Sequence, residues 1–385
     1  MAGVSDVRAD RAQAAGEQFG APAFGNPIAM LEETRPDALF VVVPPDGHHP
    51  LTIAAAERGI HVITEVPISI SLPLADLMID ACRDRGVVLE VAENAVRRPV
   101  ERLRQEVVRR GLLGPPTVAR LTYTSGSYHG IGAVCAALGE AGEALPERVW
   151  GWRHDLPMPP HVDFTGLEKR AHDWECGVFR WTGAAGPGAE GTLTLLYEQP
   201  PRPGGRNAWE VSGPLGRTAG EEVTLLTSAD GRLSERRYTM QRQTGVVNGV
   251  EALARMVLPT DPPVVWENPY VSLGMPGAPE HDRELVDCAQ LVDFYHSIID
   301  GPPPAYTAQR ARRDLELLIA LRESARHSSA PMDLPLREIT DHERALHATY
   351  RQTYGHDPLT GWREALGHLY PRGGITHGVV GRPRS

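Results

Sequence analysis

Short apolar runs alternate with helical patterns over the first hundred residues. Runs rich in β-branched residues cover 37–43, 60–64 and 87–91, and each has the length of a buried strand. Between them, 50–58 and 74–81 repeat apolar residues at helical spacing. Buried strands that alternate with helices predict βαβ units, so we expect a parallel sheet covered on both faces.

The pattern changes after about residue 115. The stretch 117–124 alternates apolar and polar positions like a half-buried strand. Similar runs follow at 191–198, 207–212 and 221–227, separated by Gly- and Pro-rich turns, and the loop 200–205 lies among them. This spacing predicts an open, mainly antiparallel sheet with one covered face.

Two long amphipathic helices are predicted next, over 284–300 and 307–326. The pattern therefore predicts an α/β fold with a parallel N-terminal domain over 1–95 and a second α/β domain over 96–340. We expect 341–385 to hold a C-terminal helix and a mobile tail, because the sequence from Arg372 onward has too little apolar content to pack.

Composition narrows the classes of function. The 385 residues are 41% hydrophobic and 23% charged, with a net charge of −10, so no domain-scale basic surface is expected for nucleic acid. No apolar run approaches the roughly 18 residues of a membrane span, and the N-terminus has no basic start or apolar core typical of a secretory signal. The sequence predicts no nucleic-acid partner and no membrane segment.

The four cysteines and the single lysine add two hypotheses. Cys82, Cys135, Cys176 and Cys288 are far apart and form no Cys-x-x-Cys pair, which favours reduced thiols in a cytoplasmic protein. Lys169 is the only lysine among 39 basic residues, so a mechanism that needs a lysine proton has one candidate. The alternative is a solvated surface lysine.

Five segments together resemble the Gfo/Idh/MocA family, the glucose–fructose oxidoreductase and inositol dehydrogenase family. They occur in the family's order and lie at 6–20, 30–45, 48–67, 93–114 and 284–336. The resemblance covers roughly residues 2–336. It implies an N-terminal Rossmann domain and a C-terminal domain with an open antiparallel sheet. It further implies NAD(P)-dependent hydride transfer on a sugar, cyclitol or polyol derivative, in a homodimer or homotetramer formed through the open sheet.

The chain departs from the family at its start. The family begins with a strand and a Gly-x-Gly-x-x-Gly loop that holds the cofactor pyrophosphate, and the start of this sequence has neither. Either the strand lies upstream of Met1, or the protein is truncated and has repacked. The first explanation is favoured, because the strand would be the middle of the sheet and its loss would leave unpaired backbone groups on both sides.

Two further departures affect the expected chemistry. The family's Glu-Lys-Pro motif is Glu65-Val66-Pro67 here, and valine cannot hold or relay a proton. The Asp-x-x-x-His motif of many family dehydrogenases is Ser125 to His129, so the histidine is kept and the aspartate is serine. Of the lysine, aspartate and histidine that the family usually has at these positions, this sequence keeps only the histidine, His129.

His129 is the first catalytic candidate. A neutral imidazole can take a proton from a hydroxyl as hydride leaves its carbon. Tyr128 is expected to donate a hydrogen bond to the same oxygen. The alternative for His129 is a helix-capping or packed histidine.

The segment 154–174 is dense in ionisable groups, and the resemblance places it in the substrate wall. Lys169 or His172 are candidates to replace the family's lysine as acid or base. The expected substrate contacts are Arg97 of the Asn-x-x-Arg motif together with His154, Asp155, Asp173 and Trp174. The spacing of the histidines and aspartates matches no metal-ligand pattern, so no metal is predicted, and the alternative is a solvated loop.

The resemblance also assigns the residues around the cofactor, NAD or NADP. Asp6 sits where an acidic residue accepts hydrogen bonds from the adenine ribose, which favours NAD, and the nearby Arg8 weakens that preference. The remaining positions that line the cofactor cleft are Pro44, His48, Glu65, Pro67 and Asn94.

Two alternatives to the dehydrogenase remain open. One is a family member that has lost its cofactor and acts as a lyase, epimerase or hydrolase. The other is a non-catalytic subunit that binds a sugar or a partner protein. Cofactor binding separates the dehydrogenase from both of them.

Overall fold

The computed structural model describes residues 1–124, 127–162, 168–182, 192–200, 207–366, 370 and 375. The N-terminal part alternates strands and helices. Its elements are β1 (Val4–Ser5), α1 (Ala9–Phe19), β2 (Ala23–Phe24), α2 (Pro27–Thr34), β3 (Ala38–Val41), α3 (His48–Glu57), β4 (His61–Thr64), α4 (Leu72–Arg85) and β5 (Leu89–Val91).

The strands of this part pair only in parallel. β1 pairs with β2, and a second sheet has the order β3-β4-β5. Val62, Ile63 and Val91 are almost fully buried, as the apolar runs in the sequence predict for a sheet covered on both faces. Because parallel strands share one direction, the segments that follow β3, β4 and β5 meet at one edge.

The second part is built on a nine-stranded sheet. Its elements are α5 (Pro99–Arg109), β6 (Val118–Thr122), α6 (Ser127–Ala137), α7 (Glu140–Glu143), β7 (Arg148–Val162), β8 (Glu168–Thr182), β9 (Thr192–Gln199), β10 (Ala208–Gly213), β11 (Gly216–Ala219), β12 (Glu222–Ala229), β13 (Arg232–Thr239), β14 (Gln241–Val247), β15 (Val250–Leu258), β16 (Val264–Glu267), α8 (Asp282–Ile299), α9 (Ala308–Arg326), β17 (Met332–Asp333), α10 (Asp341–Tyr354) and α11 (Trp362–Ala365). The sheet order is β13-β12-β11-β10-β6-β9-β8-β7-β17. β6 and β9 pair in parallel and the other neighbours are antiparallel.

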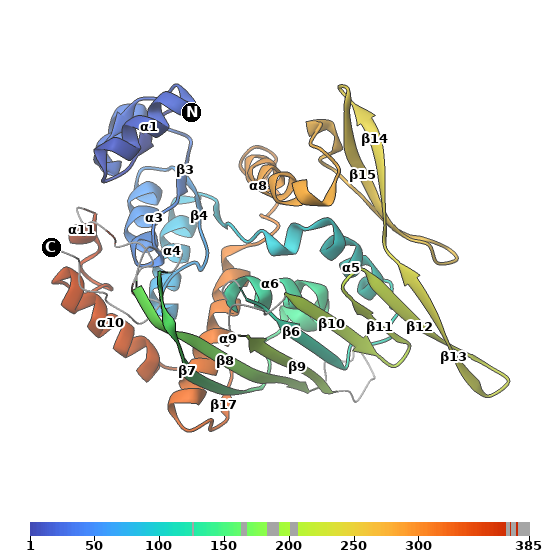
Figure 1. Ribbon diagram of the computed structural model, residues 1–385. Helices are drawn as coiled ribbons and strands as arrows, with labels where there is room; N and C mark the ends of the chain where they lie inside the picture. The colour runs from blue at the N-terminus through green and yellow to red at the C-terminus, as the bar shows by residue number, and fades with distance from the viewer. Residues whose placement is uncertain are drawn as a thin grey trace.

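Helices α6 and α9 lie on one face of this sheet (Figure 1). The approach of α9 depends on two glycines, Gly151 on β7 and Gly177 on β8, which are direct cross-strand partners. A Cβ on Gly151 would overlap the backbone carbonyl of Leu321, and a Cβ on Gly177 would meet the Leu321 side chain. The helix backbone therefore rests on a site where the sheet has no side chains.

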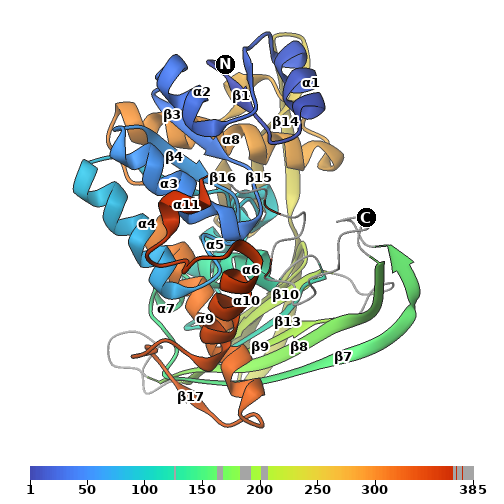
Figure 2. The same cartoon turned by 90° about the vertical axis from the view of Figure 1, so that its left-hand side faces the viewer.

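The C-terminal helices return to the N-terminal part, where α10 and α11 lie beside α3 and α4 (Figure 2). Leu74 of α4 packs in one cluster with Tyr350 and Tyr354 of α10. The Tyr354 hydroxyl donates to the buried Asp46 carboxylate over 2.5 Å. These contacts join α10 to α4 and to the segment that precedes α3.

The structure confirms the predicted α/β fold, with a parallel N-terminal sheet and a mainly antiparallel second sheet. The predicted strands and helices coincide with β3–β6, β9, β10, β12, α3, α4, α8 and α9 within a few residues. The division at 95/96 and 340/341 stays a prediction, and the loop 201–206 and most of the tail lie outside the described residues. In the described ranges no helix is long and apolar enough to cross a membrane.

One part of the fold differs from the expectation. The described residues of the polar segment 154–174, for which a solvated loop was the alternative, lie in the long antiparallel pair β7 and β8. Prolines interrupt the alternation of apolar and polar residues that would indicate a strand, because proline has no backbone N–H to donate to a neighbouring strand. The pairing register also shifts between Pro157 and His161.

Gly151→Ala tests the close packing of α9. We expect a loss of about 3 kcal/mol in the free energy of unfolding, because the methyl group must displace the α9 backbone. Urea denaturation followed by circular dichroism measures the change. Gly245→Ala is the control, since the nearest atom to its Cβ would be 3.9 Å away, on Ala254. Equal stability of the two variants would contradict the packing described for α9.

Candidate functional site

A polar group of side chains gathers where the parallel strands end. Glu65 follows β4, and Glu93 and Asn94 follow β5. α6 packs against the segment after β5 and brings His129 in its first turn to the same place. The carboxyl edge of a parallel sheet is the usual ligand site of such folds.

His129 and Glu93 form the centre of this group. The Nδ1 atom of His129 lies 3.1 Å and 3.0 Å from the two carboxylate oxygens of Glu93. The Glu93 side chain is fully buried, whereas the His129 side chain is 26% exposed. The carboxylate fixes the proton on Nδ1, so Nε2 is left as the atom that can accept or give a proton.

The surroundings of Glu93 hold it in this position. Its Oε1 atom accepts a hydrogen bond from the Ala95 backbone N–H over 2.8 Å. Its backbone carbonyl accepts one from the Arg97 guanidinium over 2.9 Å. Glu93 therefore orients His129 from a rigid support.

Burial and neighbouring charges change the pKa of the His129 imidazole. Burial alone lowers the pKa of His129, but the Glu93 carboxylate and, to a smaller extent, Glu65 outweigh burial and leave the pKa raised. Burial raises the pKa of Glu65 itself. The site thus combines two groups with raised pKa values, the imidazole of His129 and the carboxyl group of Glu65.

Aromatic rings form one wall of the site. The Tyr123 ring centre is 6.4 Å from that of His129 and stacks on Trp209 at 6.1 Å. The Trp209 indole N–H donates to the buried Glu101 carboxylate over 2.5 Å. Burial raises the pKa of Tyr123, so its hydroxyl stays protonated at neutral pH.

Two predicted site residues have other roles. Tyr128 is buried and its hydroxyl donates to the Ala311 carbonyl over 2.5 Å, so it joins α6 to α9 and does not serve as a donor to substrate. Arg97 is 1% exposed and pairs with Glu90 and, at 3.2 Å, with Asp293, so it is not a substrate contact. Both residues differ from the prediction for the same reason. Each polar group is buried, and each forms its hydrogen bond or ion pairs inside the protein.

His48 also lies inside the protein. Its Nδ1 and Nε2 atoms are 3.0 Å and 2.8 Å from the carbonyls of Pro67 and Val43. Burial lowers the pKa of His48. The ring ties together the turns after β3 and β4, and so it shapes the positions of Pro44 and Pro67.

The other predicted cofactor residues lie near the ends of strands. Asp6 follows β1, and its Oδ1 atom accepts the Arg8 backbone N–H over 2.8 Å. The Arg8 side chain pairs with Asp10, at 2.5 Å, on the surface. Asn94 is half-buried beside Glu93. Their contacts with a cofactor stay predictions.

The predicted substrate residues of 154–174 form a second group on β7 and β8. The His154 and Trp174 rings are nearly parallel with centres 5.5 Å apart, and Arg153 pairs with Asp173 at 2.9 Å. Asp155 faces Asp173 across the strands, and their hydrogen bond raises the pKa of Asp155. Lys169 pairs with His161 in the register, and His172 with Leu156.

The two groups are distinct in the fold. Figure 1 shows the far half of the β7–β8 hairpin apart from α6. The positive charge of Arg153 contributes to the lowered pKa of His342 on α10, so this part of the hairpin lies near the C-terminal helix. A joint role of Lys169, His172 and His129 at one substrate stays a prediction.

Glu93 is the site residue that the sequence analysis missed. The signal was present, because an acidic residue directly after a fully apolar strand is at the ligand edge of a parallel sheet. Ser125, which replaces the family's aspartate, lies outside the described residues.

One grouping in the described ranges has metal-ligand residue types, namely Glu323, His327 and Asp341. The Glu323 carboxylate accepts the backbone N–H groups of Asp341 and His342 at the start of α10. It serves there as a helix cap, and the positive end of the helix disfavours a cation.

Comparisons with known proteins agree with this fold. Residues 1–93 match the family model GFO_IDH_MocA, described as an oxidoreductase family with an NAD-binding Rossmann fold. A myo-inositol 2-dehydrogenase from Thermotoga maritima is 34% identical over 121 residues, which are 31% of this chain and 36% of the relative. A D-glucoside 3-dehydrogenase from Escherichia coli is 37% identical over 90 residues, or 23% of this chain and 26% of the relative. The chain thus spans about a third or less of the length of these curated relatives.

Solved structures match over most of the chain. An oxidoreductase domain protein from Kribbella flavida has a TM-score of 0.64 at 18% identity and covers 86% of this chain and 90% of its own. A levoglucosan dehydrogenase in complex with NADH and levoglucosan has a TM-score of 0.63 at 17% identity, with 86% and 89% covered. At these identities the likeness establishes the fold alone.

Glu93→Gln tests the electrostatic pairing. Without the carboxylate, burial remains as the main influence, so the pKa of His129 falls by at least about one unit. NMR titration of the His129 ring protons measures this change. Glu106→Gln, on the exposed face of α5, is the matched control and is expected to leave the titration unchanged. An unaltered pKa in Glu93→Gln would refute the pairing.

Proposed function

Because residues 1–93 match the model of the Gfo/Idh/MocA oxidoreductase family, we propose that this chain is a member of it and an NAD(P)-dependent dehydrogenase or reductase of CH–OH groups. The substrate class is a sugar, cyclitol or polyol derivative. The observation that carries the proposal is the Glu93–His129 pair at the carboxyl edge of the parallel sheet. A cytoplasmic location, suggested by the four separate cysteines, is part of the proposal.

The residues present fit the two ends of a nicotinamide dinucleotide. Asp6, half-buried after β1, offers a carboxylate for the ribose hydroxyls, which favours NAD. In the proposal the turns at Pro44 and Pro67, together with Glu65 and Asn94, line the place of the nicotinamide. Residues 1–93 contain no Gly-x-Gly-x-x-Gly, and the proposal assigns no residue to the pyrophosphate. When bound, the cofactor supplies the hydride acceptor or donor.

His129 performs the proton transfer in this proposal. In the oxidative direction Nε2 takes the proton of the substrate hydroxyl as the C–H hydride leaves the same carbon. Glu93 then stabilises the imidazolium through Nδ1–H. Val66 stands where the family has lysine and holds no proton, so His129 carries this step alone.

The protonation of His129 sets the pH dependence. Oxidation requires the neutral ring, so its rate is expected to rise with pH through the raised pKa of His129. Reduction requires the imidazolium, so its rate falls over the same interval. The Glu93 carboxylate shifts both transitions upward in pH.

The substrate class rests on the chemistry of the second group and on the relatives. Trp174 and His154 offer a stacked aromatic surface, and Asp155, Asp173, Lys169 and His172 offer hydrogen-bonding groups of the kind that hydroxyl-rich ligands use. The two curated relatives are named for oxidation of a cyclitol and of a glucoside. In the proposal the hairpin contributes to the substrate wall.

Val66 also favours a second candidate. A carboxylate–histidine pair can abstract a proton without a redox cofactor, as a lyase or epimerase requires. A non-catalytic sugar-binding subunit would need neither the cofactor nor His129. Cofactor binding and turnover therefore separate the candidates.

His129→Ala, with NAD(H) and NADP(H) titration by calorimetry, tests the proposal. We expect the wild-type chain to bind NADH, and the variant to bind it equally well while its turnover falls by about 10²- to 10⁴-fold. Turnover is followed at 340 nm with a panel of cyclitols and aldoses. His296→Ala, which alters a surface ion pair with Asp300, is the control. Absence of nicotinamide binding by the folded chain would reject the redox function.

The outer face of the nine-stranded sheet supports the proposed homo-oligomer. Trp150, Val178 and Leu196 are direct neighbours across β7, β8 and β9, so they share one face. On the same face Trp152 is 36% exposed, and Leu196 is 40% exposed. A continuous apolar patch of this kind favours association with a second copy of the chain.

Trp152→Glu tests that interface. A charge in the middle of the patch is expected to convert the dimer or tetramer to monomers, as measured by light scattering after size exclusion. Leu233→Glu, at a 74% exposed position on β13, should leave the assembly intact. A wild-type monomer would contradict the proposed oligomer.

A further inference from the structure

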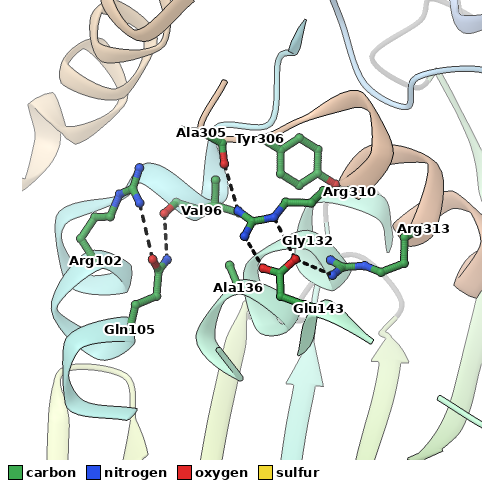
Figure 3. A pocket seen from close by; sticks show the side chains of 10 residues that line it. All are labelled: Val96, Arg102, Gln105, Gly132, Ala136, Glu143, Ala305, Tyr306, Arg310 and Arg313. Carbon is green, nitrogen blue, oxygen red and sulfur yellow. Dashed lines mark hydrogen bonds and ion pairs between the residues drawn. The ribbon is translucent and has the colours of Figure 1, made fainter. Parts of the chain in front are cut away.

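A pocket on α6 is lined by three arginines (Figure 3). It lies between α5, α6 and the start of α9 and is partly open to solvent. Arg102 lies on the α5 side, and Arg310 and Arg313 lie on the α9 side. Glu143 is the only carboxylate among the described residues that line it.

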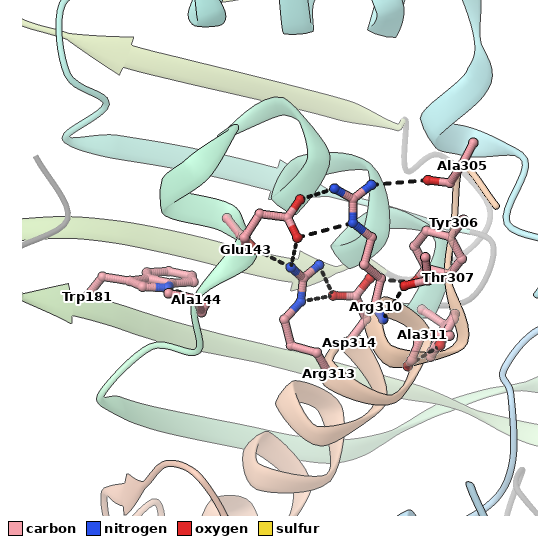
Figure 4. A network of polar contacts seen from close by, with 12 residues as sticks. Glu143, Ala144, Trp181, Ala305, Tyr306, Thr307, Arg310, Ala311, Arg313 and Asp314 are labelled. Atoms are coloured by element: carbon pink, nitrogen blue, oxygen red, sulfur yellow. Dashed lines mark hydrogen bonds and ion pairs between the residues drawn. The ribbon is translucent and has the colours of Figure 1, made fainter. Parts of the chain in front are cut away.

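Two of the arginines already have carboxylate partners (Figure 4). Arg310 pairs with Glu143 through both its Nε and its terminal nitrogen, with Nε 3.1 Å from Oε2. Arg313 lies 2.7 Å from a carboxylate oxygen of Asp314 and 3.7 Å from Glu143. These charges are compensated within the protein.

Arg102 is different. Within the described ranges it has no carboxylate within ion-pair distance, and its one hydrogen bond is a long contact of 3.5 Å to Oε1 of Gln105. The Gln105 amide is itself held by the Val96 carbonyl at 3.1 Å. The nearby Asp293 is occupied by Arg97 and by the Tyr270 hydroxyl. Arg102 therefore brings to the pocket a positive charge that has no ion-pair partner among the described residues.

Removal of this charge from water has a physical cost. Burial lowers the pKa of Arg102, and the positive charges of Arg97 and Arg310 lower it further, while Tyr270 and Asp293 offset part of this effect. A guanidinium remains charged in proteins, so the cost is reduced only by a negative partner. The planar fork of nitrogens matches the oxygens of phosphate, sulfate or carboxylate.

We propose that this pocket binds a compact oxyanion, held by Arg102 with Arg310 on the opposite side. Glu143 repels an anion, so the ligand lies on the Arg102 side of the pocket. The pocket is smaller than those that bind drug-sized molecules, which limits the ligand to the size of a single phosphate, sulfate or small carboxylate. The site does not depend on hydride transfer.

The site connects three elements of the second domain. An anion between Arg102 and Arg310 joins α5 to α9 across the α6 residues Gly132 and Ala136. Because α6 also carries His129, the ligand would stabilise the helix that supports the proposed active site. Binding to the folded state alone raises the melting temperature with ligand concentration.

Calorimetric titration of the full chain with inorganic phosphate, at constant ionic strength, tests the proposal. We expect saturable binding to the wild type and a Kd at least about tenfold higher for Arg102→Met, the loss associated with one charged hydrogen bond. Arg102→Lys keeps the charge without the fork and is expected to give an intermediate Kd. Arg109→Met, on the exposed part of the same helix, should bind like the wild type. Parallel titrations with sulfate and acetate tell a tetrahedral anion from a carboxylate.

Two results would overturn the site. The first is no binding of phosphate, sulfate or acetate by the folded wild-type chain. The second is an unchanged Kd in both Arg102 variants, which would place the anion elsewhere on the protein. Thermal melting of each variant without anion confirms that the comparison is made between folded proteins.

Discussion

Buried charged side chains need partners of opposite charge or hydrogen-bond partners, and the rest of the structure depends on this requirement. Glu93 is fully buried and holds the His129 ring, while Arg97 holds the Glu93 backbone. The guanidinium of Arg97 in turn pairs with Glu90 and Asp293, which connects β5 to α8. A charge transferred from water is tolerated only with such partners, so the geometry of the candidate site is determined by a network that extends well beyond the site. Beside this network, Arg102 has no carboxylate within ion-pair distance among the residues that the structure describes.

Helix α9 connects that network of polar contacts to the nine-stranded sheet and to α6. On one side it rests on the sheet at Gly151 and Gly177. On the other it supplies Asp314 to the Tyr306 hydroxyl and Arg310 to the arginine-lined pocket. The Ala311 carbonyl receives the Tyr128 hydroxyl, which joins α9 to the helix that carries His129. One helix therefore links the packing of the sheet to the orientation of the site.

Prediction from the sequence succeeded where the pattern is local. The apolar runs of the first domain became the buried strands β3, β4 and β5, because continuous β-branched runs fit a sheet covered on both faces. It failed for the β7–β8 hairpin, where Pro157 interrupts the ladder and charges mask the alternation. The hairpin turns at Asp230–Gly231 and Asn248–Gly249 have the positive φ angles that these residue pairs favour, and they were signals that went unused.

The sequence by itself determined the fold class through its periodicity. The order of its motifs carried the family resemblance, and that resemblance made His129 a candidate. It also placed Glu65, Asn94 and Pro67 after parallel strands. Only the tertiary structure decided the partner of each polar group. It placed Tyr128 and Arg97, which the sequence pattern assigns to the substrate, in the interior, and it placed Glu93 against His129. The physical reason is that hydrogen bonds and ion pairs join residues far apart in the chain, as Arg97 and Asp293 illustrate, and no local pattern encodes which of them meet.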